Sequence, residues 1–332
     1  MDTICKLHHP GRMTIGLEMP LDNDWSLAGD RKRKEEGRPF GVPDMSRHFV
    51  RAKLADQLGF NTLWVREVPL YDPTFGDAAQ LFDTLSYLGY LAGVTDNILL
   101  GTAAIVMPLH NPLQLAKAAA TIENLSDSRF LMGVGLGDRP VEFPVLGHSF
   151  DDRDERFRGN YEIIKEAWKE DHNLQAYYET LNANYQVYPK PKHKVPWVLA
   201  GRARQSMDWI AQNMDAWFSY PRPVQQAKEV VLNWRDALYD NDQPEKPYIT
   251  AIHLNLTKDK DQAFSPARFG GSIGINRVTD LMIGYQKAGV SHMAIHLRKS
   301  ELPIEEAMKQ LGEHVLPHFK NQMADCLRSL NN

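Results

Sequence analysis

Two long apolar runs separated by a helix-like stretch constrain the fold of this chain more than any other feature. Residues 98–109 and residues 129–137 consist almost entirely of apolar and small residues, and a stretch of helical periodicity lies between them. A strand in a parallel sheet is covered by helices on both faces, so its sequence shows a continuous apolar run. Asn111 suits the N-cap of the intervening helix, and Pro112 suits its first position. The segment therefore predicts a βαβ unit.

The first of these runs is interrupted by small residues. Residues 101–104 read Gly-Thr-Ala-Ala within an otherwise bulky apolar segment. Small side chains leave the backbone bare, so a ligand can approach closely at this point.

The same alternation of strand-like and helix-like segments extends over the whole chain. Eight strands, each followed by a helix, are typical of a (β/α)8 barrel, and an open doubly wound sheet is the alternative. We predict an α/β chain folded as the barrel, for which 332 residues suffice. The predicted strands cover residues 14–19, 62–67, 98–106, 129–135, 196–200, 216–219, 248–254 and 292–297. The predicted helices cover residues 46–58, 76–94, 112–125, 153–172, 205–213, 223–240, 276–288 and 303–326.

Three longer segments follow predicted strands one, four and seven. They cover residues 20–43, 137–152 and 255–275. All three leave from the carboxyl ends of strands, the face on which barrel enzymes build their active sites. Residues 20–43 are rich in charge, and we interpret them either as a solvated loop or as a mobile lid over the site.

Composition excludes several classes of partner. Lys and Arg number 38 against 42 Asp and Glu, so the net charge of −4 gives no electrostatic reason to expect nucleic acid or a membrane surface. The two cysteines, Cys5 and Cys326, favour a reducing compartment over a disulfide framework. There is no apolar run of the roughly 20 residues that a membrane span needs. We expect a cytoplasmic protein.

No strong catalytic or metal-binding signature is present in the sequence. Residues 133–137 superficially resemble a dinucleotide fingerprint but lack its spacing, and we expect them to pack closely at the barrel rim. His148, His172 and His193 lack metal-ligand spacing, so we expect surface residues and no metal. Glu67 closes a buried strand on the functional face and is the most interesting titratable group.

The turn after the fifth predicted strand is a candidate anion site. Residues 199–206 end a strand in small residues and begin a helix near Ser206. Helix N-termini offer unpaired N–H groups, and Gly201 would let a phosphate come close. Arg202 and Arg204 could add charge-assisted contacts. An ordinary capped turn with exposed arginines is the alternative.

Taken together, these segments resemble the bacterial luciferase-like flavin-dependent monooxygenases and oxidoreductases. The resemblance rests on residues 100–126, 129–168 and 196–206, with support from residues 59–67, and it extends from about residue 14 to residue 297. It implies one (β/α)8 TIM-barrel domain over residues 1–332, with insertions at the carboxyl ends of the strands. It also implies a bound FMN or, in a related branch, the deazaflavin F420.

Site residues follow from the resemblance, position by position. Ala103 and Ala104 would lie under the flavin ring, joined by a non-prolyl cis peptide, and Glu67 matches an acidic position close to the flavin. Many members carry a histidine directly after that glutamate, where this chain has Val68, so His110 is a candidate substitute. The remaining cofactor contacts implied are Gly135 near the ring, Gly201, Arg202, Ala203 and Ser206 around the phosphate, and Ser219 at the end of strand six.

Four functional hypotheses remain open at this point. The first is an FMN-dependent monooxygenase that acts on a small organic substrate with O2 and takes reduced FMN from a partner reductase. The second is an F420-dependent hydride-transfer oxidoreductase, and the third is a flavin-binding protein without turnover. The fourth, which the lack of metal ligands disfavours, is a barrel hydrolase without a cofactor. The resemblance further implies a homodimer through the second and third helices, with apolar surface supplied by Leu81, Leu85, Leu88 and Tyr90.

Overall fold

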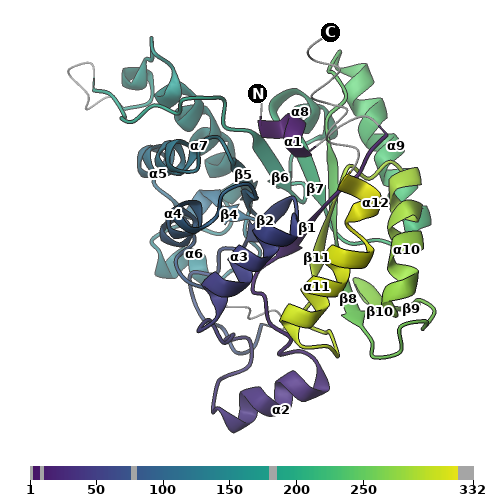
Figure 1. Cartoon of the computed structure of the whole chain (residues 1–332). Coiled ribbons are helices and arrows are strands. Elements are labelled where there is room, and N and C mark those ends of the chain that lie inside the picture. Colours follow the sequence, from purple (N-terminus) through teal and green to yellow (C-terminus); the bar gives the residue numbers. More distant parts are fainter. Residues whose placement is uncertain (1–2, 8–10, 76–80, 179–184, 321–332) are drawn as a thin grey trace.

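Eight parallel strands close into a barrel that is surrounded by helices (Figure 1). The structure is a computed structural model, and it describes residues 3–7, 11–75, 81–178 and 185–320. The last barrel strand pairs with both the seventh and the first, so the barrel prediction is confirmed and the open sheet is wrong. Around the barrel the strands are β1 (Thr14–Glu18), β2 (Thr62–Val65), β3 (Leu99–Thr102), β5 (Phe130–Gly135), β6 (Trp197–Ala200), β7 (Ala216–Ser219), β8 (Tyr248–Leu256) and β11 (His292–His296).

The outer helices follow the strands in the predicted order. The helix between β2 and β3 begins eight residues later than predicted, because Asp83 caps it by accepting a hydrogen bond from the N–H of Ser86 at 2.9 Å. Part of its predicted first turn, residues 76–80, lies outside the described residues. The helices are α3 (His48–Leu58), α4 (Thr84–Val94), α5 (Pro112–Leu125), α7 (Arg153–Trp168), α8 (Met207–Asn213), α9 (Val224–Asp240), α10 (Ile275–Lys287) and α11 (Ile304–His314).

Local sequence signals fix several helix ends. The Asn111 carboxamide accepts hydrogen bonds from the N–H groups of Leu113 and Gln114 at 3.0 and 3.2 Å, and Pro112 opens α5 as predicted. Gly59 ends α3 in the left-handed conformation, at φ +79°. The predicted last helix is shorter than expected: α11 ends at His314 and is followed by α12 (Pro317–Lys320), while residues 321–326 lie outside the described residues.

A tryptophan fills the centre of the barrel. Trp64 is buried, and its ring lies against Phe218 and His292. Gly101 makes room for it, because a Cβ on that residue would come within 2.4 Å of the Trp64 ring. Below this layer, α1 (Thr3–Leu7) brings Leu7 into the same apolar cluster. The barrel interior is therefore a packed core that supports a site only at its carboxyl end.

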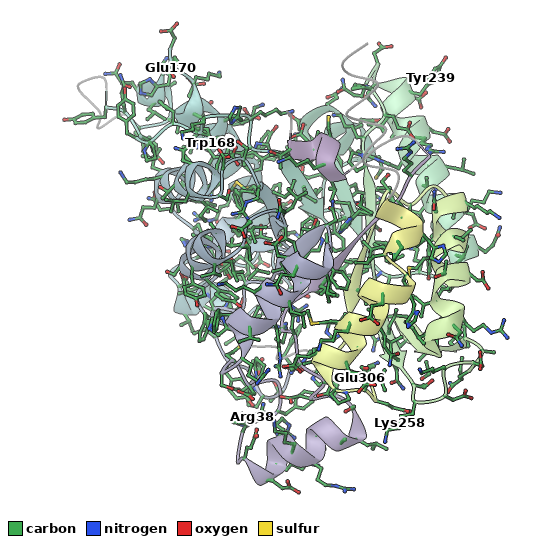
Figure 2. All side chains as sticks on the ribbon, viewed as in Figure 1. Arg38, Trp168, Glu170, Tyr239, Lys258 and Glu306 are labelled. Carbon is green, nitrogen blue, oxygen red and sulfur yellow. The ribbon has the colours of Figure 1, made fainter. Side chains whose placement is uncertain are left out.

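The insertions after β1 and β8 extend this carboxyl end. In Figure 1 the helix α2 (Leu27–Glu35) and the pair β9 (Ser265–Ala267) and β10 (Gly270–Ile273) lie at the lower side, and in Figure 2 Arg38 and Lys258 mark the same side. The described part of residues 20–43 thus contains a helix. Ser26 caps this helix by accepting from the N–H of Gly29 at 3.0 Å.

Short elements complete the chain. Cys5 is exposed and forms no disulfide within the described residues, and Cys326 lies outside them. Among the described helices, none has the length and apolar character needed to cross a membrane. The short elements are β4 (Ile105–Val106), which pairs with β5, the single-turn helices η1 (Met107–Leu109) and η2 (Leu174–Ala176), and α6 (Glu142–Val145).

Candidate functional site

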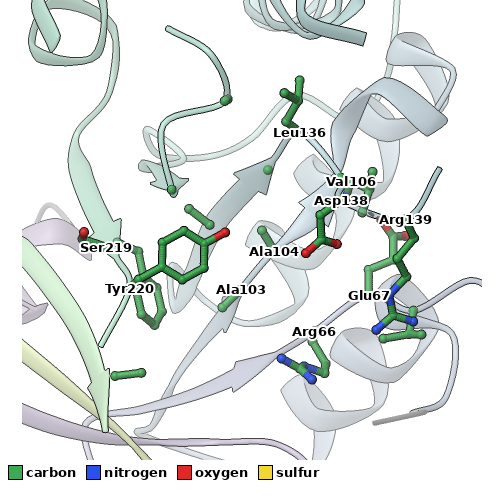
Figure 3. A pocket seen from close by; sticks show the side chains of 18 of the residues that line it. Arg66, Glu67, Ala103, Ala104, Val106, Leu136, Asp138, Arg139, Ser219 and Tyr220 are labelled. Carbon is green, nitrogen blue, oxygen red and sulfur yellow. Dashed lines mark hydrogen bonds between the residues drawn. The ribbon is translucent and has the colours of Figure 1, made fainter. Parts of the chain in front are cut away.

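A cavity of about 520 Å³ opens at the carboxyl end of the barrel, and strand ends from around the barrel contribute to its wall (Figure 3). Eight of the ten predicted site residues line it: Glu67, Ala103, Ala104, Gly135, Gly201, Arg202, Ala203 and Ser219. The other two, His110 and Ser206, are not part of this wall. The residues predicted to contact the ring and those predicted to contact the phosphate therefore line the same cavity.

Small residues form one side of the cavity. The peptide between Ala103 and Ala104 is cis, as the resemblance implied. The nearest atom to a Cβ built on Gly135 is the Cβ of Ala104, 3.2 Å away, so the backbone here is covered by nothing larger than a methyl group. Side chains of this size leave a flat surface on which a planar ring can lie.

Two neighbouring glycines are required for close packing, and of these Gly137 also lines the cavity. A Cβ on Gly133 would meet the carbonyl oxygen of Thr102 at 1.6 Å, and one on Gly137 would meet Val106 at 2.6 Å. Close packing was the expected role of residues 133–137 and is confirmed at these two positions. Of the small residues at 101–104, Gly101 is small because of Trp64, and only Ala103 and Ala104 line the cavity.

The turn after β6, residues 201–204, lines the same cavity. Gly201, Ala203 and Arg204 all have positive φ, at +69°, +45° and +58°. The N–H groups of Arg202, Ala203 and Arg204 donate to no acceptor within the described part of the chain. Successive N–H groups that point into one hollow form an anion-binding concavity. The turn therefore suits a phosphate through its backbone.

Buried contacts hold this turn in place. The N–H of Gly201 donates to the carbonyl of Phe218 at 2.8 Å, and the indole N–H of Trp217 donates to the carbonyl of Gly201 at 2.5 Å. Gln205 is buried; its amide donates to the carbonyl of Ala203 at 2.8 Å and accepts from the Arg158 guanidinium at 2.5 Å. Sequence reasoning missed Gln205, because only the folded turn shows what it contacts.

Ser206 caps the helix that follows the turn, and its expected contact with the phosphate stays a prediction. Its hydroxyl accepts from the N–H of Trp209 at 3.2 Å and caps α8, and its side chain lies outside the cavity wall. The capped turn, which was the alternative at this position, is therefore present. The helix α8 has only seven residues, so its dipole contributes little. The groups of the turn that suit an anion are the N–H groups of residues 202–204 and the guanidinium of Arg202.

Glu67 lies at the cavity wall with both carboxylate oxygens engaged. One oxygen accepts from the N–H of Val106 at 2.6 Å, and the other pairs with Nε2 of His110 at 2.8 Å. Burial lowers the pKa of His110, but the hydrogen bond and the charge of Glu67 outweigh it and the net shift is upward. His110 therefore does not line the cavity itself, but it hydrogen-bonds to Glu67 and orients the carboxylate.

Several charged or polar residues of the wall were not selected from the sequence as site residues. Figure 3 shows the carboxylate of Asp138, the ring of Tyr220 and the guanidinium of Arg66 directed toward the space beside Ala103 and Ala104. The sequence could have indicated Arg66 and Asp138 only through their positions at strand ends. That position was not sufficient to select them, because a charged residue at a strand end is more often a solvated loop residue. Glu18 and His253, which also line the wall, gave no signal of their own.

Comparison with known sequences finds one family along most of the chain. The sequence profile described as "Luciferase-like monooxygenase" matches residues 26–315. An uncharacterized protein from Mycobacterium tuberculosis is 30% identical over 231 residues, which cover 63% of this chain and 79% of that protein. An F420-dependent glucose-6-phosphate dehydrogenase from Kineococcus radiotolerans is 26% identical over 293 residues, which cover 82% of this chain and 83% of the dehydrogenase.

Solved structures share the fold at low sequence identity. A monooxygenase from Streptomyces bottropensis superposes with a TM-score of 0.70 at 19% identity, over 92% of this chain and all of that one. An F420-dependent secondary alcohol dehydrogenase, in complex with an F420-acetone adduct, gives 0.69 at 15% identity over 92% and 98%. The oxygenating constituent of 3,6-diketocamphane monooxygenase from Pseudomonas putida, in complex with FMN, gives 0.68 at 13% identity over 92% and 98%.

Proposed function

Because this chain belongs to the luciferase-like monooxygenase family, we propose that it is an oxidoreductase that binds FMN in its carboxyl-end cavity and uses it, with O2, to oxidise a small organic substrate. The supporting observation is that bare backbone at Ala103, Ala104 and Gly135 and an anion-binding turn at residues 201–204 face one cavity. A flat ring with an anionic tail needs both features within reach of each other.

The residues present fit FMN. Ala103, Ala104 and Gly135 would support the isoalloxazine ring, since no larger side chain covers the backbone there. The N–H groups of residues 202–204 and the guanidinium of Arg202 would bind the phosphate. When bound in its reduced form, FMN supplies the electrons for oxygen chemistry, and the protein supplies position and surroundings.

The other wall residues would orient the ring and exclude water from it. Val106 and Leu136 line the cavity, and Glu67 stays fixed by its contacts to Val106 and His110. Tyr220 projects toward Ala103 and Ala104 (Figure 3). Excluding water from the ring would prevent side reactions such as hydrolysis and proton leakage.

A second candidate is F420-dependent hydride transfer. Relatives whose names state an F420-dependent dehydrogenase align over as much as 82% of this chain, and one structural neighbour holds an F420 adduct. The deazaflavin ring is also planar and carries an anionic tail, so the same cavity suits it. The third hypothesis is a protein that binds flavin without turnover. It predicts that a flavin binds but that no oxygen is consumed.

We propose two protein partners for the FMN-dependent reaction. A separate reductase would supply reduced FMN. A second copy of the chain would pack on α3 and α4, where Phe49, Val50, Phe82 and Tyr90 are each at least 39% exposed. The sequence placed this surface on the second and third helices, which are α4 and α5. We propose α3 in place of α5, and Leu88 does not contribute because it is fully buried.

Titration of the purified protein with FMN and with F420 tests the proposal. We expect FMN to bind with micromolar or tighter affinity and the reduced complex to consume oxygen. Gly135→Val should abolish FMN binding, because its methyl groups would occupy the space beside Ala104. Gly159→Val is the matched control, since a Cβ there meets no atom within 4 Å.

Three results would change the assignment. Tighter binding of F420 than of FMN would favour the hydride-transfer reaction. Binding of FMN without oxygen consumption by the reduced complex would favour a flavin-binding protein. Binding of neither cofactor would refute both enzymatic proposals.

A further inference from the structure

Three polar side chains form a compact group on the side of the cavity built by neighbouring strands. Glu18 ends β1, His253 lies in β8, and His296 ends β11. Their carboxylate and ring-nitrogen atoms all lie within 4.8 Å of one another. Strand β11 pairs with β8 so that His296 is directly opposite His253, and β1 pairs with the other side of β11. Three adjacent strands therefore bring the group together.

The layer beneath the group explains why the side chains point into the barrel. Successive side chains of a strand alternate between its two faces. Gly16, Ala251 and Ala294 lie two residues before the three polar residues, and Ala251 and Ala294 belong to the apolar cluster inside the barrel. Glu18, His253 and His296 are thus one layer closer to the cavity on the same inner face.

The two imidazoles share at most one proton. Their rings stack with centroids 4.1 Å apart and an interplanar angle of 15°, so two positive charges would repel strongly at this distance. Burial, reinforced by His253 and the positive charge of Arg298, holds the pKa of His296 well below its usual range. A proton on the pair is therefore favoured on His253, of which one ring nitrogen lies within 4.8 Å of the Glu18 carboxylate.

His253 also lies between two cavities. It lines the large cavity together with Glu18, and it lines a second cavity of about 420 Å³ with Trp25, Asn255 and Lys258. Lys258 is exposed, so the second cavity communicates with solvent. A proton on His253 can therefore exchange with water through the second cavity.

A metal ion suits the group less well than a proton does. Besides Arg298, the positive charges of Arg66 and Lys299 act on His296, and each would repel a dication. The two stacked rings also hold their nitrogen lone pairs in nearly parallel, separate planes, whereas a metal ion requires the lone pairs to converge on one point. The nearby carboxylate of Asp22 forms an ion pair with Arg298 at 2.7 Å. Glu18 is therefore the acidic residue of the group.

We propose that His253 transfers a proton to or from the oxygen atoms that react in the large cavity, with Glu18 and His296 as its positioning residues. This rests on the proposed function. One oxygen atom of O2 enters the substrate, and the other leaves as water with two protons and two electrons that originate from reduced FMN. His253 donates one proton to the leaving oxygen and regains one when the cofactor is oxidised, so its net change is zero. It would supply the proton-transfer group missing at Val68.

The first test needs no cofactor and follows the ring nitrogens of ¹⁵N-labelled histidines by NMR across a pH titration. We expect His296 to stay neutral while His253 titrates. Glu18→Gln should lower the pKa of His253 by about one unit, because it removes the neighbouring negative charge. An unchanged titration of His253 in Glu18→Gln would overturn the proposal.

The second test uses the FMN-bound protein, photoreduced and mixed with oxygenated buffer. Without an organic substrate, O2 takes two electrons and two protons and leaves as hydrogen peroxide, while oxidised FMN reappears. His253→Gln should slow this step by about 100-fold or more and remove its dependence on pH, with FMN affinity unchanged. His314→Gln, on the exposed face of α11, is the control and should match the wild type.

Retention of the wild-type rate and pH profile by His253→Gln would overturn the catalytic role. Failure of the wild-type protein to bind FMN or F420 would refute the proposed function instead. In that case the NMR titration still decides whether the three residues act as one proton-binding group.

Discussion

At the scale of single residues, hydrogen bonds fix the protonation of a histidine at the centre of the barrel. The indole N–H of Trp64 donates to Nε2 of His292 at 2.9 Å, and Nδ1 of His292 lies 2.7 Å from the hydroxyl of Thr14. That hydroxyl donates to the carbonyl of Leu7 at 2.9 Å, so Nδ1 carries the hydrogen. His292 is therefore neutral and in one tautomer, which ties three elements to the Trp64 layer that supports the site.

This arrangement predicts a pH dependence of stability. Burial lowers the pKa of His292 to about 3, whereas an unfolded histidine titrates near 6.5. Between these values the unfolded chain binds a proton that the folded chain does not. The contribution of His292 to the free energy of unfolding is thus complete above about pH 6.5 and falls by about 1.4 kcal/mol per unit as the pH drops toward 3.

His292→Gln isolates this contribution, because an amide can accept from Trp64 and donate to Thr14 without titrating. We expect the slope of stability against pH, measured by urea unfolding at several pH values, to decrease by about that amount. An equal slope in both proteins would show that His292 titrates normally. His314→Gln, an exposed histidine, should leave the slope unchanged.

At the scale of elements, the insertion after β1 is anchored to the barrel. The Trp25 N–H donates to the carbonyl of Arg298 at 2.8 Å, and Asp24 pairs with Arg38 at 2.5 Å. The Asp24 side chain is only 6% exposed, so the loss of Arg38 would leave a buried charge without its partner. The ion pair therefore closes the two ends of the segment that carries α2.

Arg38→Met is expected to destabilise this segment by about 2 kcal/mol, which raises the rate of amide hydrogen exchange in α2 by about 30-fold. Exchange measured by mass spectrometry, peptide by peptide, checks the effect. Lys32→Met is the matched control, since its ion pair with Glu36 is largely exposed and contributes little. Faster exchange over the whole barrel, instead of in α2 alone, would contradict a local role.

At the scale of the whole molecule, the helices that flank β2 carry an exposed aromatic patch. Phe49 on α3 and Phe82 and Tyr90 at α4 are each between 39% and 48% exposed, and His48 contacts both Phe82 and Tyr90. Grouped exposed apolar side chains of this kind mark interaction surfaces. The patch is the reason to place a second copy of the chain here.

Phe82→Glu should convert the expected dimer into a monomer, because a charge buried at the interface lacks a partner. Size-exclusion chromatography with light scattering gives the mass of each variant. Tyr239→Glu is the control, since Tyr239 is 83% exposed on α9, on a different side of the barrel (Figure 2). A monomeric wild-type protein at working concentration would refute the dimer.

The sequence by itself determined the alternation of eight strands and helices, the cap of α5 at Asn111, and the small residues at 103 and 104. These features are readable because strand burial, helix capping and side-chain size depend on residues that are close together in the chain. The family resemblance added the cis peptide and the phosphate turn.

Only the tertiary structure decided which distant residues meet at the carboxyl end of the barrel. Glu18, His253 and His296 are separated by more than 40 residues from one another, and they meet because barrel closure sets β1, β11 and β8 side by side. The closed barrel also shows that Gly101 and Gly133 are small because of close packing, that His110 contacts Glu67 and does not line the cavity, and that Leu88 is buried. Such outcomes depend on strand register and on contacts between distant segments, which local periodicity does not encode.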